Sequence, residues 1–197
     1  MVVASYAVRV ELLEWAQRTS EEHLSGSLPR RWAHVQGVGR RAQQAWALFS
    51  GEEREILSAA AVLHDVGYAP DLATTGFHPL DGARFLASVG ASARLCGLVA
   101  HHSCAYREAE LRGLTAGLTT WTDEVTPLRD ALWWADMSTT PDGQVTNVCD
   151  RIEEIQKRYG PEDLVTLFIR QAKPELLAAV ERTEERLRTA GIDYTAK

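Results

Sequence analysis

An apolar helical run that ends in a His-Asp pair occupies the stretch Ala59-Ala60-Ala61-Val62-Leu63-His64-Asp65-Val66-Gly67. The run predicts a buried helix, and Gly67 predicts where that helix stops. Adjacent helical residues differ in direction by about 100°, so His64 and Asp65 present a nitrogen and a carboxylate to overlapping space. Because a buried His or Asp is costly unless it is paired or ligates a metal, both residues are candidate metal ligands, although the pair alone does not establish a metal site.

Helical periodicity continues on both sides of this run, and no period-two alternation lasts long enough to predict a strand. We therefore expect an all-α protein. The stretch 105–124 is less regular and indicates a short charged helix followed by a Gly/Thr-rich connection. Elsewhere the pattern predicts helices at about 6–24, 29–49, 50–66, 79–89, 92–102, 127–137, 147–159, 161–171 and 174–189.

The length of 197 residues fits a single domain, 1–197. The expected metal-site core spans about 29–137, and a C-terminal helical extension spans about 147–190. A net charge of −6 without a Lys/Arg-rich run argues against coating nucleic acid. The N-terminus does not resemble a signal peptide, and no apolar run approaches about 18 residues, so we expect no membrane span. Three cysteines without a CxxC pair indicate free thiols in a reducing cytoplasm.

Further histidines and a second aspartate also lie on or beside apolar helical faces. Taken singly, each histidine is more often a hydrogen-bonded core residue, and the aspartate more often a helix-end cap. Together they predict a shared metal centre, because imidazole and carboxylate suit Fe, Mn and Zn. The residues are His34, His64, Asp65, His78, His101, His102 and Asp136.

The order His34, His64-Asp65, Asp136 resembles the H…HD…D pattern of the HD superfamily of metal-dependent phosphohydrolases. His64-Asp65-Val66-Gly67 is similar to the HD-[IV]-G variant of the central motif, and Arg31 matches a frequent feature of the family. The resemblance covers about 29–137. It implies an HD-domain helical bundle with additional C-terminal helices, in which these four residues bind a divalent metal and Arg31 contacts phosphate or a metal ligand.

His78, followed by Pro79 and Gly82, and then His101-His102 resemble the second-metal positions of binuclear HD members. Those members include HD-GYP cyclic-dinucleotide phosphodiesterases and small HD enzymes that split symmetrical dinucleoside tetraphosphates. The resemblance implies that Asp65 bridges two metals, with His78 and His102 on the second. His101 either joins them or orients a neighbour. Fe or Mn is expected, with Zn, Co, Ni and Mg as alternatives.

Three features depart from the family pattern. Ser103-Cys104-Ala105-Tyr106 replaces the GYP signature, which argues against cyclic-di-GMP as substrate. Tyr68 stands where many relatives have a lysine that contacts phosphate. The stretch 147–197 matches no family pattern and serves either packing or a homodimer surface.

The resemblance implies metal-activated water that cleaves a phosphate ester or anhydride of a nucleotide or another small phosphorylated metabolite. Asp65 and Arg31 are the expected catalytic residues. Two alternatives use the same scaffold. One is a di-iron oxygenase that cleaves C–C or C–P bonds, and the extra histidines fit it too. The other is a non-catalytic signalling module with a structural metal, which the full ligand set argues against.

Overall fold

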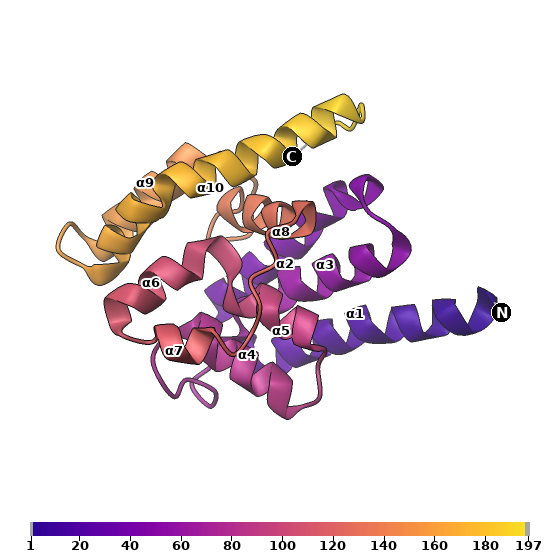
Figure 1. Ribbon diagram of the computed structural model, residues 1–197, viewed down its shortest axis with the longest axis horizontal. Helices are drawn as coiled ribbons and strands as arrows, with labels where there is room; N and C mark the ends of the chain where they lie inside the picture. The colour runs from indigo at the N-terminus through magenta and orange to yellow at the C-terminus, as the bar shows by residue number, and fades with distance from the viewer. Residues whose placement is uncertain (1, 196–197) are drawn as a thin grey trace.

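A computed structural model describes the backbone of residues 2–195 and the side chains of residues 12–195 (Figure 1). The all-α prediction is confirmed, since the described residues form no β-strand beyond an isolated bridge between Thr139 and Val145. The 3₁₀ turns are η1 (Trp46–Leu48), η2 (Val66–Tyr68) and η3 (His102–Cys104). The α-helices are α1 (Val2–Leu24), α2 (Pro29–Gln44), α3 (Gly51–Leu63), α4 (His78–Ser88), α5 (Ala93–Ala100), α6 (Ala105–Arg112), α7 (Thr115–Leu118), α8 (Pro127–Met137), α9 (Val148–Tyr159) and α10 (Leu164–Thr189).

Local sequence sets several helix starts. The side chains of Ser92, Thr126 and Asn147 each accept a backbone N–H from the first turn of the helix that follows. A polar cap of this kind satisfies a donor that the helix itself leaves without a partner. Pro127 comes directly after Thr126, at a position where its missing N–H costs nothing. These caps fix where α5, α8 and α9 begin.

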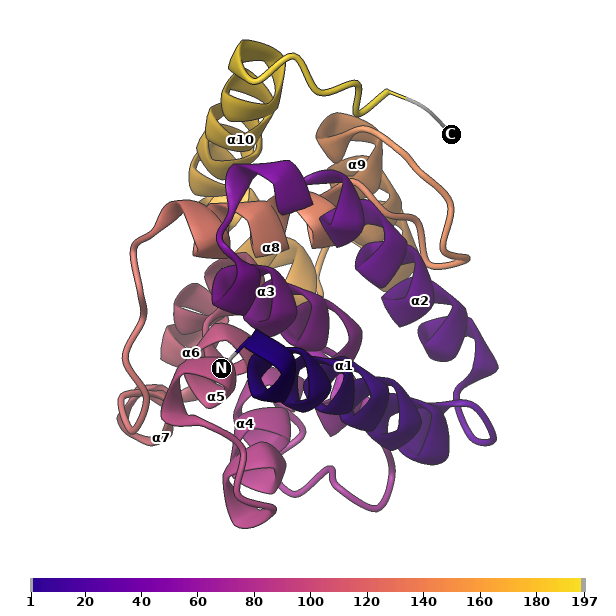
Figure 2. The ribbon, with the colours of Figure 1, turned by 90° about the vertical axis from the view of Figure 1, so that its right-hand side faces the viewer.

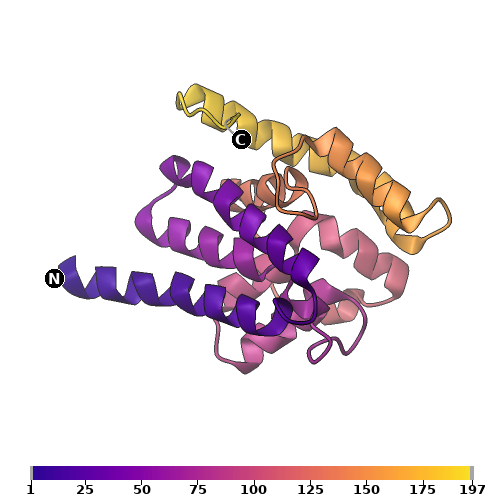
Figure 3. The same ribbon diagram turned by 180° about the vertical axis from the view of Figure 1, so that it is seen from behind.

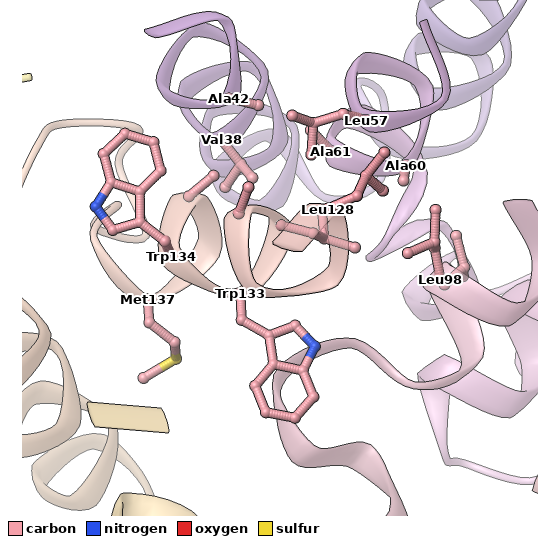
Figure 4. Packing of buried hydrophobic residues seen from close by; sticks show 14 of the residues in the cluster. Val38, Ala42, Leu57, Ala60, Ala61, Leu98, Leu128, Trp133, Trp134 and Met137 are labelled. Carbon is pink, nitrogen blue, oxygen red and sulfur yellow. The ribbon is translucent and has the colours of Figure 1, made fainter. Parts of the chain in front are cut away.

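Helices α3 and α8 form the centre of the molecule. Every residue of α3 from Ile56 to Leu63 is buried, and α1, α2, α5 and α8 all pack against this helix (Figures 2 and 3). Figure 4 shows Leu57, Ala60 and Ala61 of α3 facing the apolar side chains of α2 and α8. The small alanines let the helices approach closely, and the polar ends of α2, α3 and α8 are thereby brought together.

The expected break between helices 161–171 and 174–189 is wrong. One helix, α10, runs through Pro174. Proline removes a backbone hydrogen bond and usually kinks or ends a helix. Burial on both sides of Pro174 offsets that cost, because Phe168 and Ile169 precede it and Leu176 and Val180 follow it, all in the same core.

Ion pairs add a second attachment of α10 to α8. Arg182 and Arg186 both bind the buried carboxylate of Asp130 on α8, with N–O distances of 2.7 and 3.2 Å. All three ribbon views place α9 and α10 together on the side of α8 opposite α1 (Figures 1, 2 and 3). Among the described residues, no helix combines the length and the apolar character needed to cross a membrane.

Candidate metal centre

Three buried histidines are held with their Nε2 atoms facing one another. His64 caps the end of α3, and its Nδ1 donates to the backbone oxygen of Ala61 at 2.8 Å. His34 of α2 donates through Nδ1 to the oxygen of Thr140 at 3.0 Å, and His102 does so to the oxygen of Val99 at 2.7 Å. A carbonyl oxygen can only accept, so each Nδ1 carries the proton. In a neutral ring of this tautomer, the Nε2 atom carries a lone pair that can bind a metal.

The first group of ligand atoms surrounds His64. The Nε2 of His34 lies 3.1 Å from Oδ1 of Asp136, and the Nε2 of His64 lies 3.7 Å from the same oxygen. The Oδ2 of Asp65 lies 3.8 Å from Nε2 of His34 and 3.5 Å from Nε2 of His64. Helices α2 and α8 and the end of α3 thus bring together residues up to 102 positions apart. We call these four side chains the first donor set.

The second group of ligand atoms faces the other oxygen of Asp65. The Oδ1 atom lies 3.2 Å from Nε2 of His78, at the start of α4, and 4.0 Å from Nε2 of His102, at the end of α5. The two Nε2 atoms are 3.1 Å apart. We call Asp65, His78 and His102 the second donor set. Asp65 therefore lies between two groups of histidine nitrogens, with one carboxylate oxygen facing each group.

The structure does not bring His101 to this cluster. Its Nε2 lies 2.9 Å from the backbone oxygen of Trp121, away from both donor sets. Its own backbone oxygen accepts a hydrogen bond from the indole of Trp133. The sequence left open whether His101 joins the ligands or orients a neighbour; in the structure its contacts instead tie the end of α5 to Trp121 and Trp133.

The cluster fits a divalent cation. Ligand atoms about 2.1 Å from one ion are about 3.0–3.4 Å apart in octahedral or tetrahedral geometry, close to the separations in both sets. The Nε2 of His64 is buried and has no hydrogen-bond partner. Lone pairs that face carboxylate oxygens repel unless a proton or a cation lies between them. Two groups, His34-His64-Asp136 and His64-Asp65-His102, have ligand atoms that all lie within 4.8 Å of one another.

A family model described as "HD domain" matches residues 31–155, which is more than half of the chain. The chain belongs to the HD-domain family. The resemblance inferred from His34, His64-Asp65 and Asp136 is thereby confirmed, and it places the protein in a superfamily of metal-dependent hydrolases. No curated protein and no solved structure matched the chain.

Arg31 lies directly against the metal centre of this HD domain. Its guanidinium donates to Oδ2 of Asp65 at 2.6 Å and lies 4.0 Å above the ring of Tyr68, which in turn stacks on His78. Burial alone would raise the pKa of the Asp65 carboxyl, but Arg31, His64 and His78 together hold that pKa well below its usual range. Asp65 is therefore an anion. The ring of Tyr68 thus lies between the guanidinium of Arg31 and the ring of His78.

Electrostatics keep the remaining ligands in the form that a metal needs. Burial lowers the pKa of His78 to about 4 and also lowers the pKa of His102, so both rings are neutral near pH 7. The pKa of Asp136 falls despite burial, because the rings of His34 and His64 and the guanidinium of Arg151 stabilise its negative charge. Neutral imidazole and ionised carboxylate are the forms that coordinate divalent ions.

Ser103 is a contact of the metal centre that sequence reasoning missed. Its hydroxyl donates to Oδ2 of Asp136 at 2.5 Å, which leaves Oδ1 for the first donor set. Ser103 and Cys104 are consecutive non-glycine residues with φ of 47° and 61°, in the costly left-handed region. The tight turn aims His102 and Ser103 into the site from the end of α5. Its only sequence signal is the position of Ser103 directly after His102.

The C-terminal helices also reach the metal centre. A cavity lies over Asp65, His78, His102 and Asp136, and α9 and α10 line its far side. This wall consists of Arg151, Ile155, Arg158, Tyr159, Val165, Phe168 and Ile169. The sequence left 147–197 as packing or a dimer surface, because nothing in a local pattern shows that a later helix covers an earlier site. In the structure these helices complete the cavity.

Gly67 of the HD-Val-Gly motif controls the distance between η2 and α4. A Cβ on Gly67 would lie 2.1 Å from the backbone oxygen of His78 and 2.4 Å from the backbone nitrogen of Gly82. We expect Gly67→Ala to push α4 away, to move His78 from Asp65 and to lower the free energy of unfolding by about 1–3 kcal/mol. Thermal unfolding and metal content measure the two effects.

Gly26→Ala is the matched control, because a Cβ on Gly26 meets no heavy atom within 4 Å. Its melting temperature and metal content should equal those of the wild type. A Gly67→Ala protein that melts with the wild type and retains all of its metal would contradict the close packing of η2 on α4.

Proposed function

We propose that this HD domain is a metal-dependent phosphohydrolase that cleaves a phosphate ester or anhydride of a nucleotide or another small phosphorylated metabolite. The observation that carries the proposal is the position of Asp65, whose two carboxylate oxygens face two separate donor sets at the floor of a cavity. A carboxylate between two ligand groups suits a pair of ions, an arrangement that clamps the attacking and leaving oxygens of a phosphoryl group.

A divalent ion held by these donor sets would supply a water of lowered pKa as nucleophile and would polarise the phosphoryl oxygens. The chain's own residues prepare the site for that chemistry. Arg31 neutralises Asp65 from the protein side and, at 19% side-chain exposure, keeps part of its guanidinium open to the cavity. The backbone oxygens of Thr140, Ala61 and Val99 hold the rings of His34, His64 and His102 in one orientation. Loss of such contacts to metal ligands commonly lowers metal affinity or activity about 10- to 100-fold.

The first test is turnover by protein stripped with a chelator and reloaded with Mn²⁺ or Fe²⁺. We expect release of phosphate or alcohol from at least one class among nucleoside phosphates, aryl phosphomonoesters and aryl phosphodiesters. Activity should disappear on stripping and return on reloading, and the Mn²⁺-loaded protein should be equally active with and without O₂.

Two outcomes would reject the phosphohydrolase proposal. One is metal-loaded protein that cleaves none of these phosphorus–oxygen bonds. The other is turnover that consumes O₂ and leaves phosphate esters intact, which identifies the di-iron oxygenase reading instead.

A further inference from the structure

Arg151 on α9 is a buried cation without enough acceptors. It is 4% exposed, and its Nε has no hydrogen-bond partner. Its Nη1 donates to Glu154, one turn further along the same helix, and no other acceptor of Arg151 is found among the described residues. Burying a charged group is costly unless hydrogen bonds compensate it. A guanidinium with free donors at the wall of a cavity therefore indicates an acceptor that comes from a ligand.

The charges around the cavity favour an anion once a cation is bound. The lining contains three arginines, Arg31, Arg151 and Arg158. Asp65, Asp136 and Glu154 balance their charge, and Glu154 pairs with both Arg151 and Arg158. Glu108, the other carboxylate in the lining, is paired with Arg112 at 2.7 Å. A divalent ion in the donor sets leaves this enclosed space with excess positive charge. A phosphoryl group supplies the compensating negative charge, and Arg binds phosphate oxygens through two parallel N–H donors.

Apart from Arg158 and Tyr159, the rest of the α9–α10 wall is apolar. Ile155, Val165, Phe168 and Ile169 face the cavity with hydrocarbon side chains. The hydroxyl of Ser103, on the opposite side, is already used by Asp136. Such a wall binds an apolar or aromatic group well.

We propose that α9 and α10 form the substrate subsite of this HD domain: Arg151 binds a phosphoryl oxygen, and the apolar wall holds the leaving group. The substrate class is therefore a phosphate ester whose leaving group carries an apolar or aromatic part. Arg151 is a positioning residue for the phosphoryl group. This inference rests on the proposed function for its substrate, but the binding of phosphate by Arg151 can be measured without turnover.

The direct test measures binding of inorganic phosphate to Mn²⁺-loaded full-length protein by calorimetry. We expect Arg151→Gln to weaken phosphate binding about 10- to 100-fold, as for loss of charge-assisted hydrogen bonds. Arg151→Lys keeps the charge but not the forked donor geometry. Its phosphate affinity should lie between those of the wild type and Arg151→Gln. Lys157→Gln is the matched control, because Lys157 is an exposed cation on the same helix. Equal phosphate affinity in wild type and a folded, Mn²⁺-loaded Arg151→Gln protein overturns the role of Arg151.

The leaving-group part is tested by the ratio of kcat/KM for phenyl phosphate to that for glycerol phosphate. The wild type should prefer phenyl phosphate. We expect Val165→Asn to reduce the ratio about 3- to 10-fold, because it places an amide in the apolar wall. Leu167→Asn, on the solvent side of the same helix, should leave the ratio unchanged. A wild-type preference for glycerol phosphate, or equal effects of both variants, overturns the apolar subsite.

The two proposals fail in different ways. If wild type hydrolyses esters while Arg151→Gln keeps both its KM and its phosphate affinity, only the subsite is wrong. If Arg151→Gln loses phosphate affinity but no ester is cleaved by the wild type, the subsite stands as an anion site and the phosphohydrolase proposal is wrong.

Discussion

Asp65→Asn should lower hydrolysis by at least about 10³-fold, because one side chain serves both donor sets. Its Oδ2 faces His34 and His64, and its Oδ1 faces His78 and His102. Asparagine keeps the shape but loses the negative charge and turns one of the two acceptors into a donor. It also leaves Arg31 with no carboxylate partner. Steady-state kinetics and metal analysis of the purified variant measure the loss.

Asp142→Asn is the control for Asp65→Asn. Asp142 also forms a carboxylate–arginine pair, with Arg30, but 63% of its side chain is exposed and it lies outside both donor sets. We expect its activity and metal content to match the wild type, since an exposed pair contributes little. Circular dichroism should show the same helix content for both variants. Wild-type turnover in a folded Asp65→Asn protein would remove Asp65 from the mechanism.

His78→Ala is the second substitution with a large expected effect, and it separates the two donor sets. It removes one ligand beside Oδ1 of Asp65 but leaves His34, His64 and Asp136 in place. We expect metal content to fall from about two ions per chain to about one, and turnover to fall about 10²- to 10³-fold. Elemental analysis against protein concentration gives the stoichiometry.

His101→Gln tests whether that effect belongs to the cluster rather than to any buried histidine nearby. Glutamine retains a donor for the backbone oxygen of Trp121, the partner of His101 in the structure. Metal stoichiometry should equal that of the wild type. If His101→Gln loses an ion and His78→Ala does not, the second donor set is assigned to the wrong histidine.

The sequence predicted the fold class and most of the metal centre, because both depend on local patterns. The apolar run places His64 at the end of a buried helix, although α3 ends at Leu63 and not at about Val66 as predicted. The order of His34, His64-Asp65 and Asp136 is a pattern that needs no coordinates. The close approach of α2 to the turn after α8 is visible only in the structure, where a Cβ on Gly37 would lie 2.5 Å from Cα of Gly143.

The resemblance implied His102 as a ligand of the second metal, but the sequence left the role of His101 open. The two residues are adjacent, and which ring enters the site depends on the left-handed turn at Ser103 and Cys104. Neither serine nor cysteine signals a positive φ, because glycine and asparagine are the usual residues there. Local patterns therefore named both histidines as candidates, and only tertiary structure separates them.

Long-range packing explains the other misses. Pro174 reads as a helix end, but burial of α10 against the core keeps the helix continuous. Arg151 reads as one charged residue among many on an amphipathic helix. Its burial beside Asp136 and its free Nε exist only because α9 and α10 pack over the site.

The most direct test of the metal centre is anomalous diffraction from a crystal of the full-length protein grown with Mn²⁺. We predict a peak between the Nε2 atoms of His34 and His64 and Oδ1 of Asp136, and a second peak beside Oδ1 of Asp65 and the rings of His78 and His102. A map with no anomalous peak at either position, from protein that retains no divalent ion in solution, would contradict the account.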